Sequence, residues 1–289
     1  MKPGGDTIIC IMPPTRRELI ASAALLQPAQ PKPGSTLYVR FEHQGRISYG
    51  RLESGGVQPL SGDLFSNPRP AGRPLALNSV KLLYPCTPPK VLAVGRNYRS
   101  HLGSAPAPKR PEFFYKPVSC LQHPEGPILI PPDAKNVHYE GELVIVIGRR
   151  CRRASRAEAA AAIFGYTCGN DVSERDWQGG ADHDMQWWRA KGADTFGPMG
   201  PAIATGLDPK AGLLLETRLD GRTVQKQSTS DLLFDCVECV EFASRYVTLE
   251  PGDVIFTGTP GQTQAMLPGN VVEVSVEGIG TLRNPVRAG

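Results

Sequence analysis

Five short runs of β-branched and other apolar residues constrain the fold of this chain most strongly. In the clearest of them, Glu142 is followed by five consecutive apolar residues, Leu-Val-Ile-Val-Ile. β-branched residues favour extended backbone, and apolar runs of this length between turn residues are typical of buried strands. The sequence therefore predicts strands at residues 91–94, 142–147, 213–219, 253–256 and 271–276.

Two further segments have the pattern of a helix. Ser155 and Glu158 have the spacing of a capping box and open an alanine-rich segment, which is expected to end at Gly165. A second helix is predicted over residues 231–247, where apolar residues form one stripe at helical spacing. The 31 glycines and 28 prolines among 289 residues disfavour a helical bundle. The predicted fold class is α+β, mostly β, and not an alternating β–α–β chain.

The composition divides the chain into three segments. Residues 1–34 are interpreted as an N-terminal extension, residues 35–84 as a small β domain, and residues 85–289 as the main domain. The boundary near residue 84 rests on a stretch with six prolines that begins at Pro68. Such a stretch is typical of a stiff connection between two units.

Shorter patterns are visible within the first two segments. Residues 16–26 are expected to form a short helix in the extension. Residues 37–57 alternate between apolar and polar side chains and are broken at His43-Gln44-Gly45 and at Ser54-Gly55-Gly56. This pattern predicts a meander of strands joined by tight turns.

Charge and cysteine content exclude several classes of protein. Lysine and arginine exceed aspartate and glutamate by only four, which does not indicate a nucleic-acid partner. No apolar segment reaches the length of a membrane helix, so no membrane partner is expected. The odd number of cysteines, seven, favours a reducing, cytoplasmic location. Cys236 and Cys239 are interpreted as core residues of the second helix rather than as a zinc or redox pair.

A pair of carboxylates at the start of one predicted strand is the strongest chemical signal. Glu140 and Glu142 are two residues apart, so they project from the same face of the strand. Two neighbouring carboxylates repel each other unless a cation lies between them. A hard divalent ion such as Mg²⁺ is one interpretation, and a solvated strand end is the other.

A third oxygen ligand would favour the metal site, and the sequence offers several. Asp171 lies in a polar, acidic run that follows the alanine-rich helix; Glu174 and Asp176 are its competitors and are expected at the surface. A separate cluster, Asp182-His183-Asp184, is interpreted as a solvated loop because it follows two glycines.

Two other segments carry weaker signals. The segment Thr257-Gly258-Thr259-Pro260-Gly261 follows a predicted strand, and its amides and hydroxyls could hold an oxyanion. An ordinary turn is the alternative. Trp187 and Trp188 are expected to pack against the fold rather than to stack on a substrate.

Five motifs along the main domain occur in an order that matches a known family. They are AVGRNYRSH, HYEGELVIVIG, GNDVSERDWQ, RAKGADTFGPMGP and LEPGDVIFTGTPG, and they occupy residues 93–261. With them the chain resembles the fumarylacetoacetate hydrolase family, most closely the acylpyruvate hydrolases and the hydroxyheptadienedioate isomerase/decarboxylases. The resemblance covers residues 90–286 and implies a mixed β-roll catalytic domain at 85–289 with a small N-terminal β domain. It also implies a homodimer that acts on a small 2-oxo or diketo acid.

The resemblance implies roles for individual residues. Glu140, Glu142 and Asp171 would hold a divalent metal, with Mg²⁺ expected and Mn²⁺ or Ca²⁺ as alternatives. His101 would be the general base of a lid, and Lys191 the active-site lysine. The residues implied in substrate or oxyanion contacts are Arg96, Tyr98, Lys116, Gln178, Gly258 and Thr259.

The chain departs from the family pattern at one position of the lid. Many members have a glutamate three residues after the lid histidine, whereas this chain has Ser104. Loss of an orienting carboxylate costs roughly 10⁴-fold in a comparable hydrolytic step. Orientation of His101 by Glu112 or Glu125, or a water held by the metal, would offset this loss.

The expected activity is therefore given with its alternatives. A metal-dependent hydrolase that cleaves a C–C bond of an acylpyruvate or a fumarylacetoacetate-like diketo acid is expected first. Decarboxylation or isomerisation of a 2-oxo acid at the same metal site is the first alternative, and Ser104 favours it. A non-catalytic protein that binds a 2-oxo acid is the second alternative.

Overall fold

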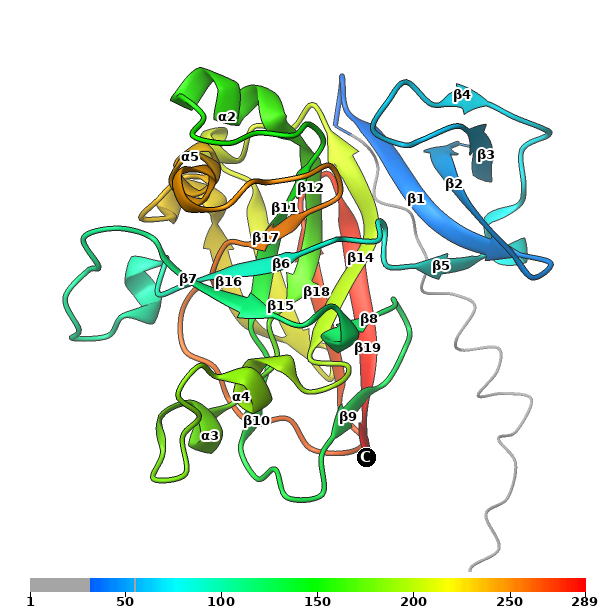
Figure 1. Ribbon diagram of the computed structural model, residues 1–289. Coiled ribbons are helices and arrows are strands. Elements are labelled where there is room, and N and C mark those ends of the chain that lie inside the picture. The colour runs from blue at the N-terminus through cyan, green and yellow to red at the C-terminus, as the bar shows by residue number, and fades with distance from the viewer. Residues whose placement is uncertain (1–31, 55) are drawn as a thin grey trace, which may run out of the picture.

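The computed structural model describes residues 32–54 and 56–289. A large mixed sheet of twelve strands runs through the molecule, with the path β4-β3-β2-β1-β14-β12-β11-β17-β6-β7 (Figure 1). β5 also pairs with β1, and β8 pairs with β14. The strands of this sheet are β1 Thr36–His43, β2 Arg46–Glu53, β3 Gly56–Ser61, β4 Arg69–Pro70, β5 Lys81–Leu83, β6 Val91–Gly95, β7 Glu112–Lys116, β8 Leu121–Gln122, β11 Gly141–Ile147, β12 Ile163–Asn170, β14 Gly197–Thr205 and β17 Val254–Phe256.

A second sheet of five strands has the order β16-β15-β18-β19-β9, and β10 and β13 form a separate pair. These strands are β9 Ile128–Ile130, β10 Val137–His138, β13 Ser173–Glu174, β15 Leu214–Leu219, β16 Arg222–Ser228, β18 Val271–Val276 and β19 Gly280–Ala288. The helices are α2 Arg156–Ala162, α3 Arg175–Gly179, α4 Trp188–Gly192 and α5 Cys236–Tyr246. In Figure 1, α2 and α5 lie together at one end of the molecule, while α3 and α4 lie near the other end. The mostly β fold class is confirmed.

β11 is central because both of its faces are covered. All seven of its residues are buried. Leu143, Ile145 and Ile147 join a core cluster with residues of the second sheet and of α5. The alternate residues Val144 and Val146 join a different cluster on the opposite face of the sheet. An uninterrupted apolar run is what a strand buried on both faces requires.

The predicted strands of the main domain are confirmed, with ends that differ by one residue at most. The capping box is also present, because Ser155 accepts from the Glu158 amide and Glu158 accepts from the Ser155 amide. However, the helix ends at Ala162, and Gly165 already lies within β12. The prediction of the helix end was wrong because Gly165 is needed in the sheet. A Cβ there would lie 2.4 Å from the Ala204 carbonyl oxygen of β14.

The second predicted helix begins later than expected. Asp235 caps α5 by accepting from the Glu238 amide, so the helix starts at Cys236, and Thr229–Asp231 form a separate 3₁₀ turn. Cys239 is fully buried and Cys236 nearly so, both in the main core, which confirms their structural interpretation.

The N-terminal meander forms as predicted, with turns after His43 and after Glu53. It continues the main sheet, because β1 pairs antiparallel with β14 through Thr36 and Thr205. The helix expected at residues 16–26, and Gly55 of the second turn, lie outside the described residues. Among the described residues, no helix is both long and apolar enough to cross a membrane.

Candidate active site

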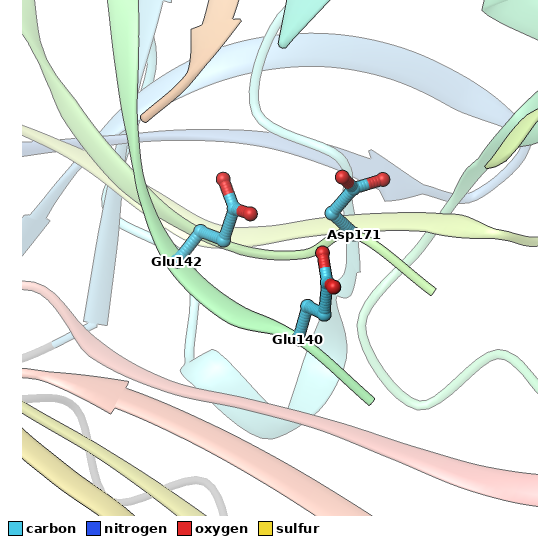
Figure 2. A group of neighbouring side chains, drawn as sticks. All are labelled: Glu140, Glu142 and Asp171. Atoms are coloured by element: carbon cyan, nitrogen blue, oxygen red, sulfur yellow. The ribbon is translucent and has the colours of Figure 1, made fainter. Parts of the chain in front are cut away.

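Glu140, Glu142 and Asp171 come together because of the way two strands pair. β11 and β12 are antiparallel, and Gly141 lies opposite Asn170. One residue beyond this pair, the Asp171 amide donates to the Glu140 carbonyl at 2.9 Å. Glu142 shares the face of Glu140 because it lies two residues further along the chain. The strand register therefore places three carboxylates around one space (Figure 2).

This carboxylate trio has the chemistry of a site for a hard divalent cation. One ligand oxygen from each residue lies within 4.8 Å of the others, and all three side chains are buried. Carboxylate oxygens are the ligands that Mg²⁺, Mn²⁺ and Ca²⁺ prefer. Glu142 accepts from the Gly258 amide at 2.7 Å and forms no ion pair with any residue the structure describes. A buried carboxylate without a cationic partner fits a metal ion as its missing neighbour.

The pKa values of the two glutamates move in opposite directions. Burial, together with the nearby carboxylates of Asp171 and Glu140, raises the pKa of Glu142 well above its usual value. Burial also acts to raise the pKa of Glu140. There, however, Lys191 and Arg175 outweigh burial and hold the pKa well below its usual value. At neutral pH the site therefore combines one firmly ionised glutamate with one that is costly to ionise without an added cation.

Three basic side chains contact this trio. The Lys191 Nζ lies 2.6 Å from a Glu140 oxygen and 2.8 Å from an Asp171 oxygen. The Lys116 Nζ lies 2.6 Å from the other Asp171 oxygen, and Arg175 lies 2.6 Å from the second Glu140 oxygen. Burial acts to lower the pKa of Lys191, but Asp171 and Glu140 outweigh it, so the pKa is raised. Lys191 is therefore a firmly charged ammonium.

The turn at 257–261 differs from a free oxyanion hole. The Gly258 amide is already bonded to Glu142, and the Thr259 hydroxyl donates to the Gly141 carbonyl at 2.9 Å. A positive φ of 101° at Gly258 favours glycine, and a Cβ there would lie 2.8 Å from Asn97 Cβ. In this arrangement the two groups hold β11 and its glutamate in place. This corrects the expectation that the Gly258 amide is free to bind an oxyanion.

His101 lies in a 3₁₀ turn, Arg99–His101, and its side chain contacts the turn at residues 257–261. Its Nδ1 lies 2.6 Å from the Gly261 carbonyl oxygen. A carbonyl can only accept, so Nδ1 carries the proton and Nε2 is left as the basic nitrogen. Neither Glu112 nor Glu125 orients the ring; Glu125 is paired with Arg283. A neutral backbone carbonyl, and not a carboxylate, is thus the hydrogen-bond partner of His101 Nδ1.

A cavity of about 320 Å³ joins these groups. Among the predicted site residues, it is lined by Arg96, His101, Glu140, Glu142, Asp171, Gln178, Lys191, Gly258 and Thr259. Phe114, Trp187 and Arg175 also line it. The Arg96 side chain donates to the Pro106 carbonyl, and Gln178 accepts from Arg175 at 2.6 Å. The cavity therefore presents several positive groups to an anionic ligand.

Two predicted substrate contacts lie elsewhere. Tyr98 is fully buried in the core, and among the described residues its hydroxyl has no hydrogen-bond partner. Lys116 is also buried, and it lies behind Asp171, where it donates to the Lys191 carbonyl as well. Neither residue lines the cavity, which corrects the expectation that they contact a substrate carboxylate.

The acidic competitors have structural roles. Glu174 is fully buried, contrary to expectation, because it accepts from the Asn136 and Trp177 amides. Asp176 is exposed, as expected. In the 182–184 segment, Asp182 is exposed and Asp184 is buried against Arg189. None of these acids reaches the carboxylate trio.

Arg175 and Trp187 are two of the cavity residues that were not identified from the sequence. Arg175 lies in the same motif as Asp171, and its place between an aspartate and Gln178 was the available signal. Trp187 was expected only to pack, but it lines the cavity with its ring against Phe114, 5.3 Å between centroids. Its backbone is left-handed, with a φ of 57°. Trp188 was also expected to pack against the fold, but it is 68% exposed and lies outside the core.

The fold and the site together define a class of protein. A mostly β scaffold buries three carboxylates at the end of two central strands, beside a cavity lined by basic residues and a histidine. The model of the fumarylacetoacetate hydrolase C-terminal domain matches residues 90–287, and an Rv2993c-like N-terminal model matches residues 37–85. The chain belongs to the fumarylacetoacetate hydrolase family, whose members are enzymes.

Three similar proteins show how wide this family is. A 5-carboxymethyl-2-hydroxymuconate delta-isomerase from Mycobacterium smegmatis is 44% identical, with a TM-score of 0.82 over 88% of this chain and 100% of its own. A 2-hydroxyhepta-2,4-diene-1,7-dioate isomerase from Mycobacterium marinum is 40% identical, with a TM-score of 0.81 over 88% and 98%. A mitochondrial oxaloacetate tautomerase from Xenopus laevis is 35% identical over 224 residues, 73% of this chain and 70% of its own length.

Proposed function

We propose that this protein is a metal-dependent isomerase that interconverts the keto and enol forms of a small 2-oxo acid, oxaloacetate being the simplest test substrate. The observation that supports it most is the neutral carbonyl of Gly261 behind His101. Hydrolysis depends on a histidine that activates water, and a carbonyl stabilises the resulting imidazolium only through its dipole. Isomerisation needs no activated water, and a bound metal would make the proton on the carbon beside the 2-oxo group easier to remove. The proposal reverses the sequence-based order, in which C–C hydrolysis was first and isomerisation the alternative.

The metal expected at this site is Mg²⁺, with Mn²⁺ and Ca²⁺ as alternatives. Glu140, Glu142 and Asp171 are the residues that would hold it, and the unpaired position of Glu142 is the feature that accommodates an added cation. When bound, such an ion polarises the 2-oxo group and adjacent carboxylate of a substrate. Metal removal by a chelator is therefore expected to abolish turnover.

The residues of the chain then divide the remaining work. Arg96, Arg175 and Gln178 line the cavity and are suited to bind a substrate carboxylate. The Nε2 of His101 removes a proton from the carbon beside the 2-oxo group and returns it to the oxygen. The electron pair left on carbon moves to form the enol double bond, so atoms and charge balance. Lys191 keeps a positive charge close to that oxygen.

The proposal is tested by following both reactions in the same protein. With Mg²⁺ present, the enol form of oxaloacetate is expected to convert to the keto form much faster than in the uncatalysed reaction. The total amount of oxaloacetate should stay constant. Acetylpyruvate is expected to yield no acetate under the same conditions. Ultraviolet absorbance measures the enol, and proton NMR measures the products; His101→Gln is the control without the base.

Other products would indicate one of the alternatives. Acetate and pyruvate from acetylpyruvate would support a hydrolase, the activity for which the family is named. Carbon dioxide and pyruvate from oxaloacetate would support a decarboxylase. Binding of oxaloacetate without any faster conversion would support the non-catalytic alternative. Each of these outcomes would contradict the isomerase proposal.

We also propose that two copies of this chain associate through one apolar face. Tyr115, Val118, Met185 and Trp188 are exposed to 57%, 51%, 94% and 68%. Three of them line a groove of about 710 Å³ together with Trp187 and other residues. Aromatic residues and methionine are enriched in protein interfaces, and most soluble oligomers are symmetric copies of one chain.

A charge on this face is expected to separate the copies. Trp188→Glu should convert a dimer to a monomer, measured by light scattering coupled to size-exclusion chromatography. Leu267→Glu is the matched control, because Leu267 is similarly exposed, at 64%, and does not line this groove. A wild-type monomer, or a dimer in the Trp188 variant, would contradict the proposed interface.

The location proposed for the protein remains the cytoplasm. All the cysteines that the structure describes are free, which suits a reducing compartment.

A further inference from the structure

The buried side chain of Gln225 links groups that otherwise belong to separate parts of the site. Gln225 lies on β16 at the edge of the second sheet, opposite Thr217 of β15, and is 4% exposed. Its Oε1 accepts from the Gly141 amide at 3.0 Å. Its Nε2 donates to the Thr259 hydroxyl at 2.8 Å and to the Pro260 carbonyl at 2.6 Å.

These hydrogen bonds close a ring with a single consistent direction. The Gly141 amide donates to Gln225, Gln225 donates to the Thr259 hydroxyl, and that hydroxyl donates to the Gly141 carbonyl. Rotating the amide by 180° would place an NH₂ against the Gly141 amide and an oxygen against the Pro260 carbonyl. Both contacts would then be lost, so the network itself determines the orientation of the side chain.

The ring holds the strand residue that separates two of the three carboxylates. Gly141 lies between Glu140 and Glu142, so displacing its backbone displaces both. A Cβ at Gly141 would lie 2.0 Å from the Thr217 hydroxyl and 3.2 Å from the Gln225 Oε1. The second sheet therefore approaches this backbone as closely as only glycine permits.

The ring also reaches the general base through the same five-residue turn. Gly258 contacts Glu142, Thr259 and Pro260 contact Gln225, and the Gly261 carbonyl accepts from His101. The Gly261 amide in turn donates to the Ser100 hydroxyl at 3.0 Å. One side chain from the second sheet is thus bonded to the carboxylate strand and to the turn that orients the base.

We propose that Gln225 is a positioning residue, which sets the place of His101 relative to the carboxylate trio by holding Gly141 and the 259–261 turn together. The proposal rests on the proposed function in that His101 is taken to be the base. Residues that orient ligands in this way typically change metal affinity or activity by roughly 10–100-fold when they are replaced. Such an effect differs from a loss of stability, because it persists in folded protein.

The test compares Gln225→Met with Gln227→Met in the full chain. Both substitutions remove an amide from the same strand at similar volume, but Gln227 donates to Asp231 at the surface. Four quantities are measured well below the unfolding temperature: the imidazole ¹⁵N shifts of His101, the Mg²⁺ dissociation constant, kcat and KM. In the wild type, the shifts should report a proton on Nδ1.

For Gln225→Met, we expect mixed tautomers of His101, Mg²⁺ binding weakened roughly 10-fold, and kcat reduced roughly 10–100-fold with KM changed less. Gln227→Met should match the wild type. If Gln225→Met lowers only the thermal midpoint, while the tautomer and Mg²⁺ affinity stay unchanged, the residue is merely structural and the proposal is overturned.

A second variant covers the case in which Gln225→Met fails to fold. Thr259→Val removes the hydroxyl between Gln225 and Gly141 while keeping the shape of the side chain, and it should reproduce the same changes. Where both variants fold, the double variant should be no worse than either single one, because they break one network. If the losses of the two single variants added up in the double variant, Gln225 and Thr259 would not act in one hydrogen-bond network. The ¹⁵N shifts and Mg²⁺ binding need no turnover, so a failure of the proposed function would not be confused with a failure of this inference.

Discussion

Replacing Glu142 by glutamine is expected to lower metal-dependent turnover by about 10³-fold or more, since loss of a metal ion removes several kcal/mol of transition-state stabilisation. Glutamine keeps an oxygen for the Gly258 amide, 2.7 Å away in the wild type, so the local backbone should not change. Mg²⁺ binding, followed by calorimetry, should weaken in parallel. The side chain shape is retained and only the charge is lost.

The same variant should not destabilise the metal-free protein. The raised pKa of Glu142 means that its protonated form favours the folded state. This contribution is present below the usual carboxyl range and is lost as the pH rises toward the higher folded value. Metal-free wild type should therefore lose stability above the ordinary glutamate pKa, and Glu142→Gln should lose less. Denaturant unfolding at pH 5 and pH 8 measures the difference. A less stable variant at pH 8 would contradict the unpaired state of Glu142.

Replacing Lys191 by methionine is expected to have the opposite effect on stability. Its ammonium contacts both Glu140 and Asp171, and it is 3% exposed. Removing one partner of a buried ion pair typically costs about 3–5 kcal/mol, because the remaining charge stays buried. The thermal midpoint of the metal-free protein should fall by roughly 5–15 °C. Turnover should also be lost, because no ammonium remains beside the substrate oxygen.

Added metal separates the electrostatic cause from a general loss of packing. Saturating Mg²⁺ should reverse part of the fall in the thermal midpoint of Lys191→Met, since the ion supplies positive charge to the same carboxylates. Lys210→Met is the matched control: Lys210 is exposed, its ion pair to Asp235 is 4.0 Å long, and little change is expected. An unchanged midpoint in Lys191→Met, or one that Mg²⁺ does not raise, would contradict this role.

Local rules accounted for much of the fold and for part of the site. The apolar run of β11 and the Ser155 capping box depend on residues close together in the chain, and both formed as predicted. The predicted helix ends were less accurate. Gly165 lies in β12, where β14 comes too close for a side chain, and Asp235 caps α5 later in the chain than expected. A capping residue or a glycine has a local meaning only until a distant strand competes for it.

What the sequence by itself determined is the content of the site. Strand periodicity places Glu140 and Glu142 on one face, and the motifs indicate the family. The tertiary structure decided which partners these groups have: Asp171 through the β11–β12 register, Gly261 behind His101, and Gln225 beneath Gly141. These contacts join residues 31 to 160 positions apart in the chain, as from Glu140 to Asp171 or from His101 to Gly261. Local propensity carries no information about such pairs, because they form only when whole strands pack and exclude water.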